Sequence, residues 1–95
     1  MKLDELQIKK QLSLAFENYK NRKFQTAEKL YKEILALNKN HLDANFNLGT
    51  LYSQLRKFDL ALPLLMKAKE LNPNNINILL NIGNLILDRG DRETS

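Results

Sequence analysis

Cysteine is absent from the 95-residue chain. Its absence excludes disulfides, thiolate zinc sites and thiol nucleophiles, and it is consistent with a reducing compartment. Glycine and proline are scarce, at 3 and 2 residues, which disfavours a loop-rich or all-β fold. No segment is long and apolar enough to span a bilayer, and the first residues lack the apolar stretch of a signal peptide. We therefore expect a single cytoplasmic domain with no membrane partner.

A concentration of one charge sign is also lacking. The chain has 15 Lys and Arg against 11 Asp and Glu, a net charge of +4, and the basic residues are scattered. A nucleic-acid binder usually gathers basic residues on one face and interleaves aromatic ones, so we expect no nucleic-acid partner. The only histidine, His41, has no convergent partners for catalysis or metal binding, and no phosphate-loop or nucleophile motif is present. The sequence predicts no enzyme activity, no metal and no cofactor.

The chain does have internal similarity at a fixed spacing. When the sequence is shifted by 34 residues, Phe24 falls on Phe58, Ala27 on Ala61, and Asn47 on Asn81. Apolar residues recur at helical spacing in five segments, which are residues 4–20, 24–37, 42–54, 58–71 and 76–89. The joints between them are short and polar, so consecutive helices should pack antiparallel.

The middle unit carries the repeat pattern most fully. Its matching positions hold Leu48, Gly49, Tyr52, Ala61, Leu65, Ala68 and Pro73. This pattern resembles the tetratricopeptide repeat (TPR) family. The resemblance implies an all-α, TPR-type α-solenoid of antiparallel helix pairs in one domain, residues 1–95. The repeats would be about 8–41, about 42–75 and a partial third unit at about 76–93. It also implies a turn at Gly90 and Asp91.

Small residues at matched phases should let the helix axes approach one another. They are Ala15, Gly49, Gly83, Ala27, Ala61 and Ala68. Tyr31 and Leu65 share a phase and are predicted to be core residues. Acidic residues of the second helices, such as Glu28, are predicted to form solvated surface.

In TPR proteins the first helix of each pair lines the concave side, so the resemblance implies a peptide-binding groove. The predicted groove residues are Ser13, Phe16, Phe46, Asn47, Thr50, Leu80, Asn81 and Asn84. Asn47 and Asn81 are favoured because an amide offers both a donor and an acceptor to an extended peptide. The alternative is that these asparagines are solvated or cap nearby backbone. The carboxylate clamp of chaperone-binding TPR domains matches only at Asn47, so we expect no chaperone-tail binding.

The last segment is apolar around much of its circumference. A self-association surface is predicted there, formed by Ile78, Leu79, Ile82, Leu85 and Ile86. Three functions stay open at this point. The chain is an interaction module or scaffold for a protein or peptide partner, a segment that forms a homo-oligomer through its last helix, or the N-terminal TPR arm of a larger enzyme such as a glycosyltransferase.

Overall fold

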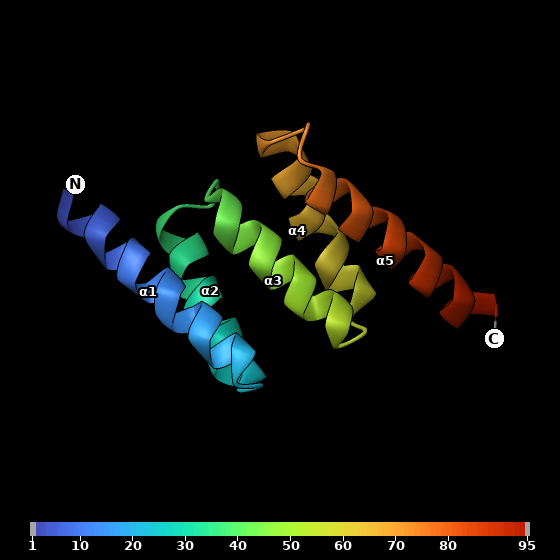
Figure 1. Ribbon diagram of the computed structural model, residues 1–95, viewed down its shortest axis with the longest axis horizontal. Helices are drawn as coiled ribbons and strands as arrows, with labels where there is room; N and C mark the ends of the chain where they lie inside the picture. The colour runs from blue at the N-terminus through green and yellow to red at the C-terminus, as the bar shows by residue number, and fades with distance from the viewer. Residues whose placement is uncertain (1, 95) are drawn as a thin grey trace.

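Five helices in two layers form the fold. The computed structural model describes the backbone of residues 2–94 and the side chains of residues 5–90. The helices are α1 (Lys2–Lys20), α2 (Phe24–Leu37), α3 (Leu42–Gln54), α4 (Phe58–Leu71) and α5 (Ile76–Thr94) (Figure 1). Residues 2–94 contain no strand, and the predicted all-α fold is confirmed. None of these helices has the length and hydropathy that crossing a membrane requires.

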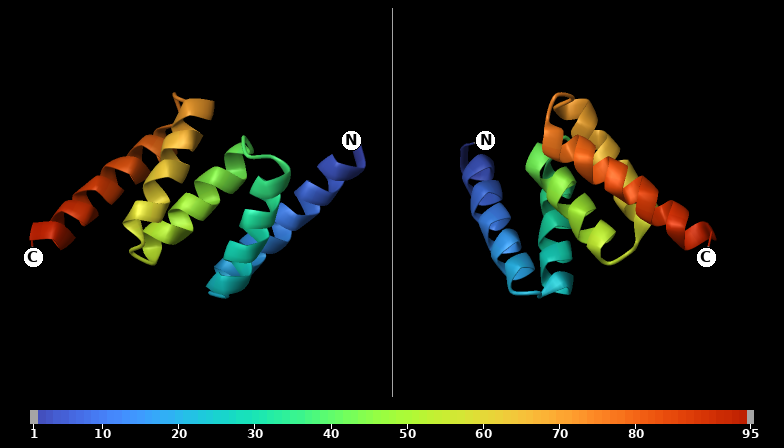
Figure 2. Two further views of the ribbon diagram at one scale, coloured as in Figure 1. Left: turned by 180° about the vertical axis from the view of Figure 1, so that it is seen from behind. Right: turned by 45° about the vertical axis from the view of Figure 1, so that its right-hand side comes forward.

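The helices alternate between the layers along the chain. Helices α1, α3 and α5 face the viewer in Figure 1, and α2 and α4 come forward when the molecule is seen from behind in Figure 2. The extents are 48 × 29 × 19 Å, so the helices form a stacked array and do not surround a single centre. Helix α3 lies in the middle and contacts each of the other four helices.

The joints at matching positions of the repeat have the same backbone and capping features. Arg22 and Arg56 end the α1–α2 and α3–α4 turns with left-handed φ angles of 63° and 60°. At the start of α3, the His41 Nδ1 atom accepts a hydrogen bond of 3.2 Å from the Ala44 N–H. The Asn75 Oδ1 atom accepts an equivalent bond of 3.2 Å from the Ile78 N–H at the start of α5. Side-chain caps of this kind satisfy backbone donors that have no partner within the helix.

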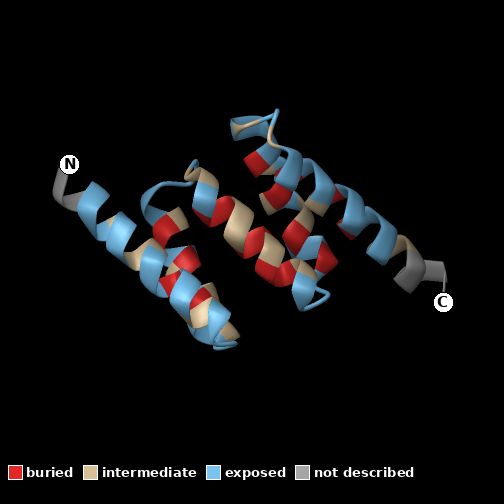
Figure 3. Cartoon of the chain, in the orientation of Figure 1, coloured by how far each residue is buried: buried red, intermediate tan, exposed pale blue. Residues whose placement is uncertain are grey.

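Buried alanines and one glycine bring the helices together. Ala15, Ala27, Ala61 and Ala68 are fully buried. Figure 3 shows that the buried residues lie mainly where the helices face one another. A Cβ atom added at Gly49 would lie 2.8 Å from the Leu65 side chain, so this glycine is required for the close packing of α3 on α4. The same expectation is not met at Gly83, where an added Cβ would have no atom within 4 Å.

Two further sequence-based predictions are wrong. Helix α5 continues through Gly90 and Asp91 to Thr94, so the predicted turn does not form. A glycine costs a helix interior only about 1 kcal/mol relative to alanine, which is too little to end a helix by itself. Glu28 is not simply solvated, because its Oε2 atom accepts a 2.6 Å hydrogen bond from the Tyr52 hydroxyl. The packing of α2 on α3 brings this carboxylate within reach of the tyrosine.

Candidate peptide-binding groove

The layer of α1, α3 and α5 presents all eight predicted groove residues to solvent to some degree. Helix α3 contacts both α1 and α5, so the three helices form one continuous face. The residues that are more than about a third exposed are Ser13, Phe16, Leu80 and Asn84. Those that are partly exposed are Phe46, Asn47, Thr50 and Asn81. A partner that approached this face would meet side chains from three helices.

Four of these residues come together around one cavity, which we call the aromatic pocket. Its volume is about 160 Å³, and it lies where α1, α2 and α3 meet. It is lined by Phe16, Tyr19, Tyr31, Phe46, Asn47 and Thr50. Four of the eight predicted groove residues thus line this cavity, and they come from the first helices of two repeat units.

Aromatic rings make up much of the pocket wall. The rings of Phe16 and Tyr19 stack with their centroids 6.1 Å apart and an interplanar angle of 23°. The Lys20 ammonium lies 5.1 Å from the centroid of the Phe16 ring, which is a cation–π distance. The site thus offers apolar ring surface to a guest.

The polar groups of the pocket lining come from Tyr19, Tyr31, Asn47 and Thr50. The Thr50 hydroxyl donates a 2.9 Å hydrogen bond to the Phe46 carbonyl oxygen, which leaves its oxygen able to accept only. The Tyr31 hydroxyl is buried and meets the criteria for a hydrogen bond with no group in the described chain. Burial raises the pKa of Tyr31 to about 12, and a weaker hydrogen-bonding interaction with the Asn47 side chain lowers it; the Asn47 amide therefore lies near the hydroxyl, although the pair falls outside the distance and angle limits of a hydrogen bond. The hydroxyl thus keeps its proton at neutral pH and lies close enough to Asn47 to be influenced by it.

A second hollow continues the same face toward the start of α1. It has a volume of about 530 Å³. Its lining includes Lys9 and Leu12 from α1, Asp43 from α3, and His41 from the joint between α2 and α3. Residues of α1 and α3 line both hollows.

The other predicted residues lie outside both hollows. Ser13, on α1, lines neither of them, and Leu80, Asn81 and Asn84 extend the face on α5. The sequence analysis missed Tyr19 as a pocket residue and assigned Tyr31 only to the core. The sequence did contain a signal for Tyr31. The matching residue one unit later is the apolar Leu65, so a hydroxyl at this core position is unusual.

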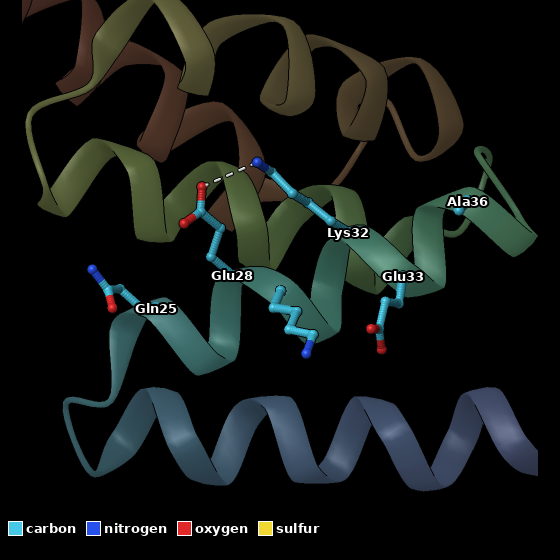
Figure 4. Close-up of a pocket in the computed structure, with 6 residues that line it drawn as sticks. Gln25, Glu28, Lys32, Glu33 and Ala36 are labelled. Atoms are coloured by element: carbon cyan, nitrogen blue, oxygen red, sulfur yellow. Dashed lines mark ion pairs between the residues drawn. The ribbon is translucent and has the colours of Figure 1, made fainter.

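The hollow on the outer surface of α2 is a poor candidate for a ligand site. Figure 4 shows that its side chains come from this one helix and spread over its surface. The Lys32 ammonium pairs with the Glu28 carboxylate at 3.3 Å, so these charges already have partners. Among the described residues, no three His, Asp or Glu side chains gather into a metal site.

The sequence profile of the tetratricopeptide repeat family matches residues 19–80. The chain belongs to the tetratricopeptide repeat family. TPR arrays are protein-interaction scaffolds, and this chain has the fold of such a module. Among proteins with curated descriptions, none matches this chain significantly.

Solved TPR structures resemble the chain closely. MamA AMB-1 is 29% identical with a TM-score of 0.82, and the match covers 92% of this chain and 48% of MamA. The C-terminal TPR-containing domain of a Plasmodium falciparum FK506-binding protein is 25% identical with a TM-score of 0.89, covering 97% and 61% of the two chains. SycD, a type III secretion translocator chaperone from Yersinia enterocolitica, shows the same fold at 19% identity and a TM-score of 0.81, covering 87% and 63%. The TPR chain spans about half the length of the MamA structures that it matches.

Proposed function

We propose that this TPR chain binds an extended peptide segment of a partner protein along the face of α1, α3 and α5. The observation that carries the proposal is the convergence of Phe16, Phe46, Asn47 and Thr50 on one cavity. The second hollow beside Leu12 and the exposed Leu80 extend this surface in both directions. Ring surface would anchor apolar parts of the peptide, and the amides of Asn47 and Asn81 would pair with its backbone.

A random peptide library displayed on phage would test this proposal with the purified chain. We expect the selected peptides to lose roughly tenfold or more in affinity when Phe16 is changed to alanine, because truncating an interface anchor usually has an effect of this size. The Asn47→Ala, Asn81→Ala double variant should weaken the same peptides. Calorimetric titration of each purified variant would measure these losses.

A double variant on the outer surface of α2 is the matched control. Gln25 and Lys29 are exposed and lie away from the proposed groove, so Gln25→Ala with Lys29→Ala should leave peptide affinity unchanged. Peptides that bind the asparagine double variant as tightly as the wild type would contradict the asparagine ladder. Failure to select any peptide, or affinity that depends on Gln25 and Lys29, would contradict the groove.

Self-association through α5 is a second candidate, and a comparison of α5 with α3 favours it. Asn45 and Tyr52 of α3 are each 3% exposed, whereas Leu79 and Ile86, which occupy the matching positions of α5, are 43% and 55% exposed. Gly83 lies between them with open space above it, where Gly49 has Leu65. We propose that α5 of a second copy covers this stripe in a twofold dimer, since an exposed apolar stripe with a glycine at its centre permits close helix contact.

Only some of the predicted α5 residues are available for a dimer contact, because the others are buried in the chain's own core. Ile78, Ile82 and Leu85 belong to the chain's own core, so of the five predicted residues only Leu79 and Ile86 are left for a partner. We expect Ile86→Asp to reduce the molar mass measured by light scattering at high concentration from dimer to monomer. Leu14→Asp, at an exposed position on α1, should leave the mass unchanged. A wild-type chain that stays monomeric at every concentration would rule out this candidate.

A further inference from the structure

One residue of the aromatic pocket, Tyr31, carries a buried hydroxyl that makes no hydrogen bond among the described residues. Tyr31 is 0% exposed, and its hydroxyl has no hydrogen-bond partner in the described chain. Buried polar groups in folded proteins are nearly always paired, because an unpaired one has given up its water without compensation. Tyr31 lines a cavity in the proposed groove, so a group that enters the cavity and reaches the buried hydroxyl would become its partner.

We infer that the aromatic pocket receives an uncharged carboxamide side chain, glutamine or asparagine, from the bound peptide. The inference rests on the proposed groove function and specifies one residue of its ligand. The polar groups of the pocket lining determine which guest can pair with them: Tyr31 offers a proton, Thr50 offers a lone pair, and Asn47 and the Tyr19 hydroxyl each offer both. A primary carboxamide can pair with these groups, because its oxygen accepts a hydrogen bond from Tyr31 and its NH₂ group donates to Thr50 or Asn47.

The ring surfaces of the pocket suit the rest of such a side chain. The methylene groups of a glutamine would pass between the rings of Phe16, Tyr19 and Phe46, which line the cavity. A volume of about 160 Å³ is ample for one side chain of this size. An apolar side chain of the same length would fill the space but would cover the Tyr31 hydroxyl without pairing it.

Charge is the remaining criterion, and it favours a neutral guest. No Asp, Glu, Lys or Arg lines the pocket. The nearby charges have opposite signs, with the Lys20 ammonium over Phe16 and the Asp43 carboxylate acting on Tyr31. A buried carboxylate or ammonium would lose its water and gain no dedicated counter-charge, which is unfavourable.

Single amino acids with both ends capped as amides would test this inference directly. The probes are the N-acetyl methylamides of glutamine, methionine, glutamate and glycine, titrated into the ¹⁵N-labelled full chain. Affinities should be roughly millimolar, given the small size of the probes. We expect the glutamine probe to shift the amide signals of Phe46, Asn47 and Thr50 and to bind roughly three- to tenfold more tightly than the methionine probe.

The other probes distinguish binding of a side-chain amide from binding of a backbone amide. The glycine probe carries only backbone amides, and equal binding by it would assign the pocket to the peptide backbone and overturn the inference. Equal or tighter binding by the methionine or glutamate probe would overturn it as well. Either result would leave the phage selection in place as the independent test of the groove.

Removing one oxygen atom tests the role of Tyr31. Tyr31→Phe keeps the ring and removes an unpaired buried hydroxyl, so we expect it to fold at least as stably as the wild type. It should abolish the preference for glutamine over methionine without weakening the methionine probe. Tyr52→Phe removes a hydroxyl outside the pocket and should leave the preference intact. A preference that survives Tyr31→Phe would overturn the inference, and the wild-type titrations decide it even if this variant does not fold.

Discussion

At the scale of single residues, the contact between Glu28 and Tyr52 couples α2 to α3. The Tyr52 hydroxyl donates to the Glu28 carboxylate at 2.6 Å, and the Lys32 ammonium lies 3.3 Å from the same oxygen. The hydrogen bond from Tyr52 is the largest influence on the carboxylate and lowers the pKa of Glu28 from its ordinary 4.5. The ionised form of Glu28 is thus the one that stabilises the fold.

This contact predicts a pH-dependent loss in Tyr52→Phe. A hydrogen bond to a charged group contributes roughly 1.5–3 kcal/mol, and we expect a loss in unfolding free energy within that range at neutral pH. Because the pKa of Glu28 is lowered in the folded state, its stabilisation is complete above pH 4.5 and disappears as the pH falls through the lowered value. Urea unfolding of both proteins at neutral and acidic pH would show the two curves converging in acid.

A charge-neutral variant provides the control for that experiment. Glu28→Gln keeps an acceptor for Tyr52 but has no proton to gain, so its stability should vary less with pH than that of the wild type. A difference between wild type and Tyr52→Phe that is the same at both pH values would contradict the assignment of the effect to Glu28.

Asn45 is the buried polar residue that secures the joint between α2 and α3. It is 3% exposed, and its Nδ2 atom donates to the carbonyl oxygens of Lys39 and His41 at 3.1 and 2.8 Å. We expect Asn45→Leu to lower the unfolding free energy by about 1–3 kcal/mol, because the Lys39 carbonyl loses the side-chain donor and the His41 carbonyl keeps only the backbone N–H of residue 45. Leu79 occupies the matching position one repeat later and is exposed, so Leu79→Asn should change stability by less than about 0.5 kcal/mol. Thermal or urea unfolding of dilute samples would compare them.

At the scale of whole helices, the two glycines at matched positions should respond oppositely to alanine. Alanine is favoured over glycine in a helix by about 1 kcal/mol. At Gly83 nothing lies within 4 Å of the added Cβ, so Gly83→Ala should stabilise the chain by up to that amount. At Gly49 the Cβ would lie 2.8 Å from Leu65, and overpacking of roughly 1–3 kcal/mol should exceed the gain. Stabilisation of both variants in urea unfolding would contradict the close contact of α3 and α4.

The sequence predicted the helices well because their ends are marked locally. The predicted ranges of α2, α3 and α4 agree with the observed Phe24–Leu37, Leu42–Gln54 and Phe58–Leu71. Each lies between short polar joints that interrupt a clear apolar period. The end of α5 was misjudged because the family pattern expects a turn at Gly90, and a lone glycine is a weak stop signal.

Contacts between helices were harder to predict than the helices themselves. Repeat phase places Phe16, Phe46 and Asn47 on one face, and they do converge. It could not show that Tyr31 carries its hydroxyl from the second layer to the pocket, or that Tyr52 reaches Glu28. It also could not separate the buried from the exposed residues of α5. These outcomes depend on crossing angles and side-chain lengths, which a period does not encode.

At the scale of the whole molecule, the contacts form an almost linear stack. In the part of the chain that the structure describes, helix α5 contacts α3 and α4 and neither of the first two helices, whereas α3 contacts all the others. In such an array each unit is stabilised mainly by its neighbours, and the ends can open while the middle stays folded. We expect amide hydrogen exchange to be slowest in α3 and faster in α1 and α5.

Two leucines at matched positions allow this expectation to be tested with one kind of substitution. Leu51 in α3 and Leu85 in α5 are 0% and 1% exposed, and each Leu→Ala change should remove roughly 2–5 kcal/mol of stability from its surroundings. Leu51→Ala should speed exchange in all five helices, because each of the others packs on α3. Leu85→Ala should speed exchange in α5 and at the adjoining side of α4, while α2 keeps its wild-type rates. Equal acceleration of α2 by both variants, measured residue by residue by NMR, would show that the stack opens only as a single unit.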